Sequence, residues 1–109
     1  MNTMSVPSKN KSLFTAIREV GSHIPEGIVA TYGQIAKKVG SNDARKVGWA
    51  IYNNQNPKVP CHRVVKKDGS VAENFSLGGW QEQKSRLLSE GVTFSTEKQV
   101  DLERHLWRI

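Results

Sequence analysis

Two short helical segments lie close together between residues 31 and 54, and this spacing is the feature that most constrains the fold. In "TYGQ", Thr31 can cap a helix and Gln34 can reach back to it, which predicts a short helix over about residues 32–39. Gly40 ends that helix, polar residues of "GSND" can cap the next one, and "ARKVGWAIYNN" predicts the second helix. The pair is a helix-turn-helix candidate, although glycine-linked helices also occur in proteins that never touch DNA.

The other patterns predict two further helices and one turn. From Ser12 onward apolar residues recur at helical spacing, which predicts a helix that ends near Gly21. The stretch "WQEQKSRLLSEG" is typical of an amphipathic helix that ends at a glycine. Between short β-branched runs, Asp68-Gly69 predicts a hairpin turn, with Cys61 at the entrance of the hairpin. The expected fold class is therefore mostly α-helical with a small β-hairpin.

A chain of 109 residues fits one domain. Residues 1–11 lack periodicity, so we expect a disordered N-terminal arm followed by a single domain over residues 12–109. The tail "VTFSTEKQVDLERHLWRI" is only loosely periodic, and we expect Leu102, Leu106 and Trp107 to fold back onto the body.

Charge and composition limit the classes of partner. With 16 Lys and Arg against 10 Asp and Glu, the formal net charge is +6 at pH 7, which favours a polyanionic partner such as nucleic acid. Apolar runs fall short of the roughly 20 residues that span a bilayer, so we expect no membrane segment. One cysteine and no signal-like apolar stretch predict an intracellular protein, cytoplasmic or at the nucleoid or nucleus, whose thiol stays reduced.

The stretch "VPCHRVV" places Cys61 between Pro60 and the pair His62 and Arg63. A thiol becomes a useful nucleophile when a base or a positive charge stabilises its thiolate, and both are next to it in the sequence. In an extended strand His62 would point away from Cys61, so a working pair needs a bridging water or a turn, which Pro60 favours. The plainest alternative is a buried structural cysteine.

Two other kinds of cysteine chemistry find little support in the sequence. His23, His62 and His105 show no spacing typical of a zinc site with Cys61, so we expect no metal. Papain-like catalysis requires a distant histidine and an amide that orients it, which three scattered histidines neither support nor exclude.

"VPCHRVV" resembles the active-site motif of the O6-alkylguanine-DNA alkyltransferases, the methylated-DNA–protein-cysteine methyltransferases, and four more pieces match that family in order. "TYGQIA" is similar to the first helix of its helix-turn-helix, and "ARKVGWAIYNN" to its recognition helix and the asparagine that follows. "NFSLGG" is similar to its active-site loop, and "LLSEG" to the segment with its structural glutamate. The resemblance covers about residues 13–94 and implies a winged helix-turn-helix-like domain.

The family extrudes an alkylated guanine from duplex DNA and transfers the alkyl group irreversibly to its cysteine, without a cofactor. By this resemblance Cys61 is the alkyl acceptor, His62 acts through a water as its base, and Glu90 orients His62. Arg45 replaces the extruded nucleotide in the base stack, and Tyr32 presses on its phosphate.

The resemblance also implies binding through the minor groove, which suits a recognition helix with small residues such as Ala44, Gly48 and Ala50. The implied DNA contacts are Tyr32, Arg45, Gly48, Trp49 and Arg63. The implied pocket and structural residues are Asn54, which buttresses the active-site turn, and Pro60, Phe75, Ser76, Gly78 and Gly79. Each has a plainer interpretation as a surface aromatic, a solvated charge, an ion-pair partner or a cap.

Some residues depart from the family pattern. Trp49 stands where a small residue is common, Phe75 replaces the loop tyrosine, and Leu77 adds a residue before Gly78. We expect the N-terminal domain of most members, and any zinc site in it, to be absent. The length and tail resemble the alkyltransferase-like proteins, which bind alkylated guanine without repairing it and normally lack the cysteine.

Because Cys61 is retained, we expect a single-turnover methyltransferase that acts as a monomer on double-stranded DNA containing alkylated guanine. The alternative is a non-catalytic sensor that binds O6-alkylguanine and recruits nucleotide excision repair proteins. A transcription factor that uses the same helix pair leaves "PCHR" unexplained.

Overall fold

The computed structural model describes residues 9–52, 54–75 and 77–109. Most of the expected N-terminal arm, residues 1–8, lies outside the described residues. Helix α1, Lys9–Gly21, begins earlier than the apolar pattern predicted, so residues 9–11 of the expected arm are helical. None of the helices in the described ranges has the length and apolarity needed to cross a membrane.

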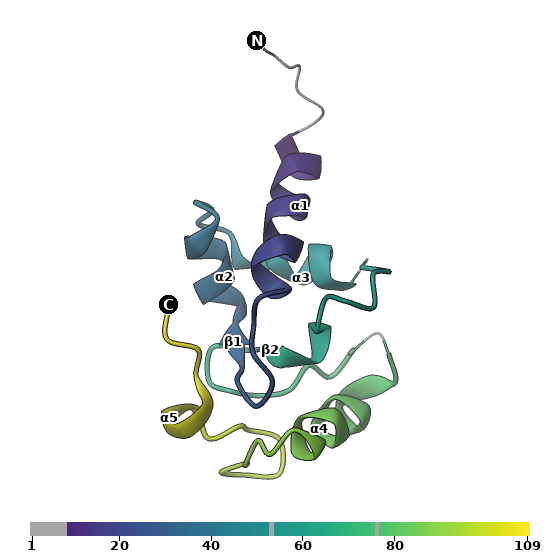
Figure 1. Ribbon diagram of the computed structural model, residues 1–109, viewed down its shortest axis with the longest axis vertical. Coiled ribbons are helices and arrows are strands. Elements are labelled where there is room, and N and C mark those ends of the chain that lie inside the picture. Colours follow the sequence, from purple (N-terminus) through teal and green to yellow (C-terminus); the bar gives the residue numbers. More distant parts are fainter. Residues whose placement is uncertain (1–8, 53, 76) are drawn as a thin grey trace.

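The predicted helix pair is confirmed. Helix α2, Tyr32–Lys38, starts at the predicted capping box, in which the Gln34 amide N–H donates to Thr31 Oγ1 at 3.1 Å and the Thr31 amide N–H donates to Gln34 Oε1 at 2.9 Å. Helix α3, Ala44–Tyr52, follows after the glycine turn. These two helices pack on each other and on α1 (Figure 1).

The predicted β-hairpin is wrong. Strand β1, Ala30–Thr31, pairs in parallel with strand β2, Val64–Val65, so the partner of β2 lies far upstream in the chain. The Asp68-Gly69 turn does form, since the Gly69 amide donates to the Lys66 carbonyl at 2.8 Å. Beyond it, however, Ser70 bridges to Gln99 in the tail.

The backbone conformation and the surroundings of residue 69 explain why that turn needs a glycine. Its φ is +89°, and a Cβ at this position would lie 2.8 Å from the carbonyl oxygen of Val100. The turn therefore brings the backbone directly against the tail.

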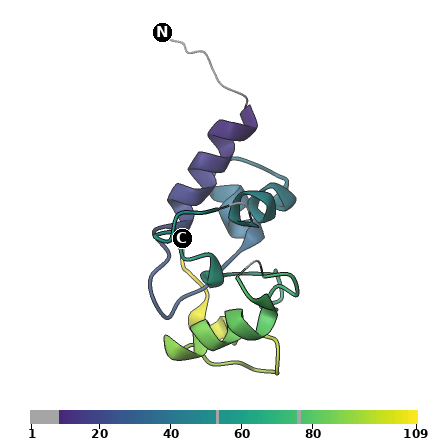
Figure 2. The ribbon, with the colours of Figure 1, turned by 90° about the vertical axis from the view of Figure 1, so that its right-hand side faces the viewer.

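The C-terminal part folds back as predicted. Helix α4, Gly79–Ser89, and the short helix α5, Leu102–His105, lie on the side of the small sheet away from α1 to α3 (Figures 1 and 2). Leu106 bridges to Val29, and the Trp107 amide donates to the Val29 carbonyl at 2.7 Å. The tail thus pairs with the residue just before β1 through an isolated parallel bridge.

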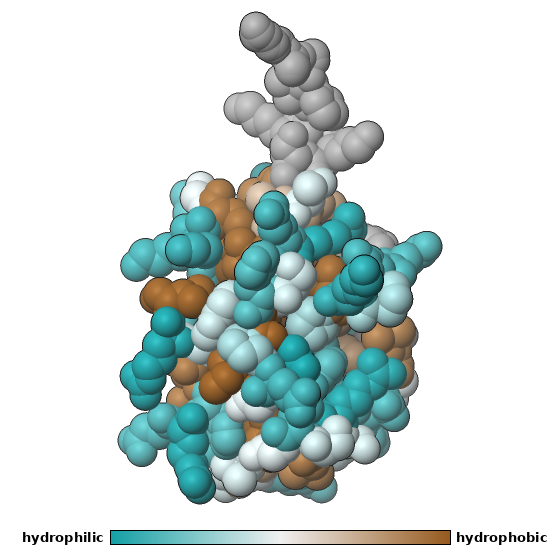
Figure 3. Space-filling view, viewed as in Figure 1, coloured by the Kyte–Doolittle hydropathy of each residue, from teal (hydrophilic) through white to brown (hydrophobic). Residues whose placement is uncertain are grey.

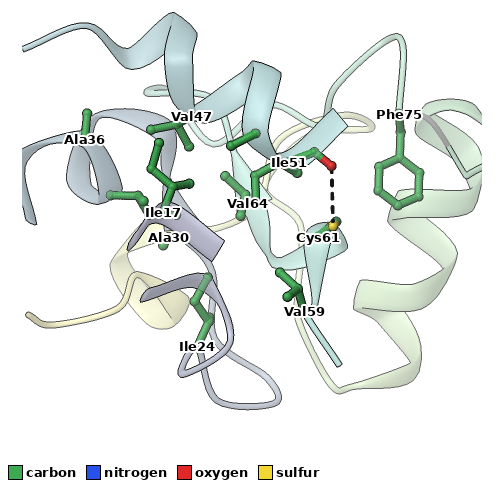
Figure 4. Packing of buried hydrophobic residues seen from close by; sticks show 12 residues of the cluster. Ile17, Ile24, Ala30, Ala36, Val47, Ile51, Val59, Cys61, Val64 and Phe75 are labelled. Atoms are coloured by element: carbon green, nitrogen blue, oxygen red, sulfur yellow. Dashed lines mark hydrogen bonds between the residues drawn. The ribbon is translucent and has the colours of Figure 1, made fainter. Parts of the chain in front are cut away.

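The buried residues form two clusters. The first lies between α1, α2 and α3 and extends to the 3₁₀ turn η1, Cys61–Arg63, and the second lies between the sheet, α4 and the tail. The first contains Ile17, Ile24, Ala30, Ile35, Ala36, Val47, Ala50, Ile51, Val59, Cys61, Val64 and Phe75 (Figure 4). In the view of Figure 3 hydrophilic side chains cover most of the surface, with hydrophobic ones in scattered patches.

Candidate functional site

Cys61 begins the turn η1, which the chain enters from Pro60. The backbone is a tight turn rather than an extended strand, because the Arg63 amide donates to the Pro60 carbonyl at 2.9 Å. The Cys61 side chain reaches the C-terminal end of α3, where Sγ donates to the Ile51 carbonyl at 3.7 Å, and the Phe75 ring lies across from it (Figure 4). Only 6% of Cys61 is exposed.

Asn54 holds the thiol from a second direction. Its Nδ2 donates to Cys61 Sγ at 3.4 Å and to the Asn56 carbonyl at 2.9 Å, so one amide ties the loop before Pro60 to the sulfur. Burial raises the pKa of the Cys61 thiol, and the Asn54 hydrogen bond and the charges of Arg18 and Arg86 offset only part of that effect. The free protein therefore holds a protonated thiol.

His62 and Glu90, which the sequence assigned to one relay, are in contact. His62 Nε2 lies 2.6 Å from Glu90 Oε2, and both side chains are largely buried. Burial alone would raise the pKa of the Glu90 carboxyl, but hydrogen bonds from Arg63 and His62 outweigh it and lower the pKa to about 2. Glu90 is thus a fixed anion beside the imidazole.

Arg63 lies in this ion pair rather than on the surface. Its Nη2 is 2.8 Å from Glu90 Oε2, and its Nη1 donates to the Ile24 carbonyl at 2.7 Å. The expected DNA contact at Arg63 is therefore not supported by its placement, and its plainer interpretation as an ion-pair partner holds.

The predicted link between His62 and Cys61 stays a prediction. Although the two residues share one turn, no hydrogen bond joins their side chains in the described part of the chain. The thiol is directed to Ile51, and the imidazole is directed to Glu90.

A hollow of about 340 Å³ opens beside Cys61, within the size range of small-molecule sites. It brings together four predicted site residues from separate elements, namely Tyr32 of α2, Gly48 of α3, Cys61 of η1 and Phe75 of the loop after β2. Burial raises the pKa of the Tyr32 hydroxyl, and the neighbouring Cys61 adds to the effect. The other residues that line this hollow are Ile51, Tyr52, Lys66, Ala72, Glu73 and Asn74.

A second hollow of about 440 Å³ also has Cys61 in its wall. It is lined by residues 54–63 together with Ser22, Leu77 and Arg86. Leu77, the additional loop residue, thus faces this second hollow and is half exposed. Cys61 lies where the walls of the two hollows meet.

The expected DNA contacts of α3 lie on its exposed face, with one correction. Arg45 is 79% exposed in its side chain and pairs with Asp43 at 3.0 Å, and half of Trp49 is exposed. A Cβ at Gly48 would meet nothing within 4 Å. Ala50, expected among the small groove-lining residues, is fully buried against the core instead, because it lies on the opposite face of the helix.

Two of the expected loop residues have backbone roles. Gly78 has φ +128°, and a Cβ there would lie 2.9 Å from the Glu82 Cβ, so the loop can enter α4 only with glycine at this position. Gly79 begins α4 with φ +81°. Ser76, the expected pocket serine, lies outside the described residues.

Gln83 is a site residue that the sequence did not reveal. It is fully buried in α4, where its Nε2 donates to the His62 carbonyl at 3.2 Å and to the Val64 carbonyl at 2.9 Å. Its Oε1 accepts from the Ala72 amide at 2.7 Å. A glutamine inside an amphipathic helix gives no signal of such contacts, since glutamine is usually exposed.

Residues 12–92 match the family described as "6-O-methylguanine DNA methyltransferase, DNA binding domain". The chain belongs to this family. It is a family of DNA-binding proteins concerned with alkylated guanine, and its DNA-binding unit is the part that forms α1 to α4 and the Cys61 hollow.

Relatives in the family include proteins of about this length. The chain is 39% identical over 103 residues to the DNA base-flipping protein of Escherichia coli, covering 91% of this chain and 77% of that protein. It is 36% identical over 101 residues to alkyltransferase-like protein 1 of Schizosaccharomyces pombe, covering 87% and 94%.

Two solved structures share the fold. S. pombe Atl1 in complex with damaged DNA containing O6-carboxymethylguanine has a TM-score of 0.82 at 31% identity, covering 97% of this chain and all of that one. The O6-methylguanine methyltransferase of Mycobacterium tuberculosis has a TM-score of 0.58 at 29% identity. There the match covers 81% of this chain but 51% of the methyltransferase, so this chain spans about half of that protein.

Proposed function

We propose that the protein binds duplex DNA through α2 and α3, receives an extruded O6-alkylguanine in the hollow beside Cys61, and transfers the alkyl group to Cys61 Sγ once per molecule. One observation carries this proposal: a buried thiol forms the inner wall of a hollow lined by aromatic rings, immediately before a histidine that is held by a fixed carboxylate. Purines stack on aromatic rings, and enzymes that act on a base take it out of the duplex.

The transfer needs no cofactor. A new bond forms between Sγ and the alkyl carbon as the bond between that carbon and O6 breaks, and the thiol proton ends on the restored guanine, which stays in the DNA. Because burial keeps the thiol protonated at rest, the proton has to leave Sγ during the reaction. His62, acting through a water, is the base in the proposal, and the Glu90 anion orients its ring and stabilises its charged form.

The proposed docking uses the minor groove. Arg45 at the start of α3 is exposed and pairs with Asp43 on the surface, so it can leave that pair and fill the space of the extruded nucleotide. Tyr32 at the start of α2 lies at the edge of the same hollow, where it can press on the phosphate of that nucleotide.

A second candidate function is a sensor that binds O6-alkylguanine, transfers nothing and recruits nucleotide excision repair proteins as a monomer. One observation favours it: the fold matches that of an alkyltransferase-like protein with a TM-score of 0.82 and that of a methyltransferase with a TM-score of 0.58. The hydrogen bond of Sγ to Ile51 also points the thiol toward the protein in the free state.

Whether the lesion in the DNA is restored to guanine distinguishes the two functions. A duplex carries O6-methylguanine inside a restriction site whose cleavage requires guanine, and it is incubated with one equivalent of wild type or of Cys61→Ser. We expect wild type to restore cleavage in proportion to protein added and Cys61→Ser to restore none while still binding the duplex. If wild type binds the lesion and cleavage is never restored, the protein is the sensor.

A further inference from the structure

The exposed face of α3 carries a row of residues at helical spacing. Arg45, Gly48 and Tyr52 stand at positions i, i+3 and i+7 and therefore share one side of the helix. The opposite side is buried in the core through Val47, Ala50 and Ile51.

Tyr52, at the last turn of this helix, combines exposure with a place at the hollow. Tyr52 lines the hollow of about 340 Å³ that also contains Tyr32, Cys61 and Phe75. Even so, 61% of Tyr52 is exposed, a larger fraction than for any other large hydrophobic residue described. Its hydroxyl forms no hydrogen bond with the residues that the structure describes. Neither folding nor a hydrogen bond within that part of the chain explains a tyrosine at this position.

The other aromatic residues of the hollow are already covered. Phe75 is 8% exposed and has the Arg86 guanidinium 5.7 Å from its ring centre, and Tyr32 packs against the core. Tyr52 is thus the aromatic side chain at this hollow with most of its surface still available to a ligand.

We propose that Tyr52 stacks on the extruded base at the mouth of the hollow and so determines the preference of this protein for damaged over intact DNA. The inference rests on the proposed extrusion of the base, but not on transfer of the alkyl group to Cys61.

The geometry of α3 supports this role. Tyr52 lies seven positions after Arg45 in the helix, which corresponds to about 10 Å along the axis. Gly48 between them has no side chain and has open space where a Cβ would be. On this face Arg45 can fill the gap in the base stack, and Gly48 leaves room for the sugar-phosphate backbone. Tyr52 then offers the extruded base a ring on which to stack.

The test compares three substitutions at Tyr52 by their affinity for a duplex with one O6-methylguanine and for the same duplex with guanine, at one fixed salt concentration. Stacking predicts that Tyr52→Phe keeps the lesion affinity within about twofold, Tyr52→Leu loses part of it, and Tyr52→Ala loses about tenfold. Affinity for the intact duplex should change less than twofold in all three. Leu88→Ala is the matched control, because Leu88 is 52% exposed on α4 and lines neither hollow.

Each other outcome contradicts a distinct part of the inference. Equal losses on damaged and intact duplex would make Tyr52 a general groove contact. If Tyr52→Phe is as weak as Tyr52→Ala, the hydroxyl binds DNA and stacking is excluded. A lesion preference that survives in Tyr52→Ala overturns this inference alone, whereas a wild type with no lesion preference overturns the proposed function as well.

Discussion

Glu90 joins the turn η1 to the loop before β1. Its carboxylate binds His62 and Arg63 of η1 and accepts from the Gly27 amide at 3.3 Å. The motif "PCHR" predicted reactive chemistry at this turn, but it could not distinguish an Arg63 that pairs with Glu90 from an Arg63 that is exposed on the surface. That distinction depends on where residue 90 lies after folding, which local sequence does not specify.

This carboxylate makes stability depend on pH. The pKa of Glu90 is lowered from 4.5 to about 2 on folding, so its contribution is complete above 4.5 and is lost as the pH falls toward 2. The shift corresponds to roughly 3 kcal/mol. We expect urea unfolding of wild type to show this loss and Glu90→Gln to lack it, with exposed Glu97→Gln as control. Parallel pH profiles for wild type and Glu90→Gln would contradict the assignment.

At the scale of elements, short sequence motifs predicted the helices that residues close together in the chain stabilise. The capping box of Thr31 and Gln34 and the glycine turn after α2 lie within a few residues of each other, and both helices formed as expected. The strand pairing could not be predicted in this way. Ala30 and Val64 are far apart in the chain, and the turn at Asp68-Gly69 indicates a reversal without saying which segment pairs with β2.

Gln83 connects the elements around the thiol. Replacement by leucine keeps the volume but removes the hydrogen bonds to the His62 and Val64 carbonyls and from the Ala72 amide. Because unpaired buried groups are costly, we expect Gln83→Leu to lose about 3 kcal/mol of unfolding free energy, measured in urea. Gln81→Leu, an exposed position of the same helix, should change it little. A loss at Gln83 no larger than that at Gln81 would show that the three hydrogen bonds contribute nothing net.

At the scale of the whole molecule, the net charge of +6 and the exposed row on α3 describe two separate parts of DNA binding. In the proposed function, charge contributes to affinity for any duplex, and the hollow distinguishes the lesion. Composition predicted affinity for a polyanion, and the motifs predicted four residues of the wall of the hollow, Tyr32, Gly48, Cys61 and Phe75. The motifs missed Tyr52, because a tyrosine at the end of a helix gives no sign that a pocket opens beside it.

The salt concentration should change the affinity for any duplex but not the preference for the lesion. Affinity for both the O6-methylguanine duplex and the intact duplex should fall steeply and in parallel on a double-logarithmic plot, because phosphate contacts release the same counterions in both. Arg45→Ala should reduce affinity for the lesion duplex more than affinity for the intact duplex, since the proposed role of Arg45 begins once a nucleotide has left the stack. Affinity that does not depend on salt would contradict the proposed phosphate contacts.

Transfer to Cys61 is tested most directly by the intact mass of the protein after incubation with one equivalent of duplex containing O6-methylguanine. We predict that the wild-type mass increases by one methyl group in place of one hydrogen, that a proteolytic peptide containing Cys61 carries the gain, and that further duplex adds nothing. Cys61→Ser should bind the same duplex with its mass unchanged. A wild type that holds the lesion tightly while its mass stays unchanged would contradict transfer and leave the protein as a sensor.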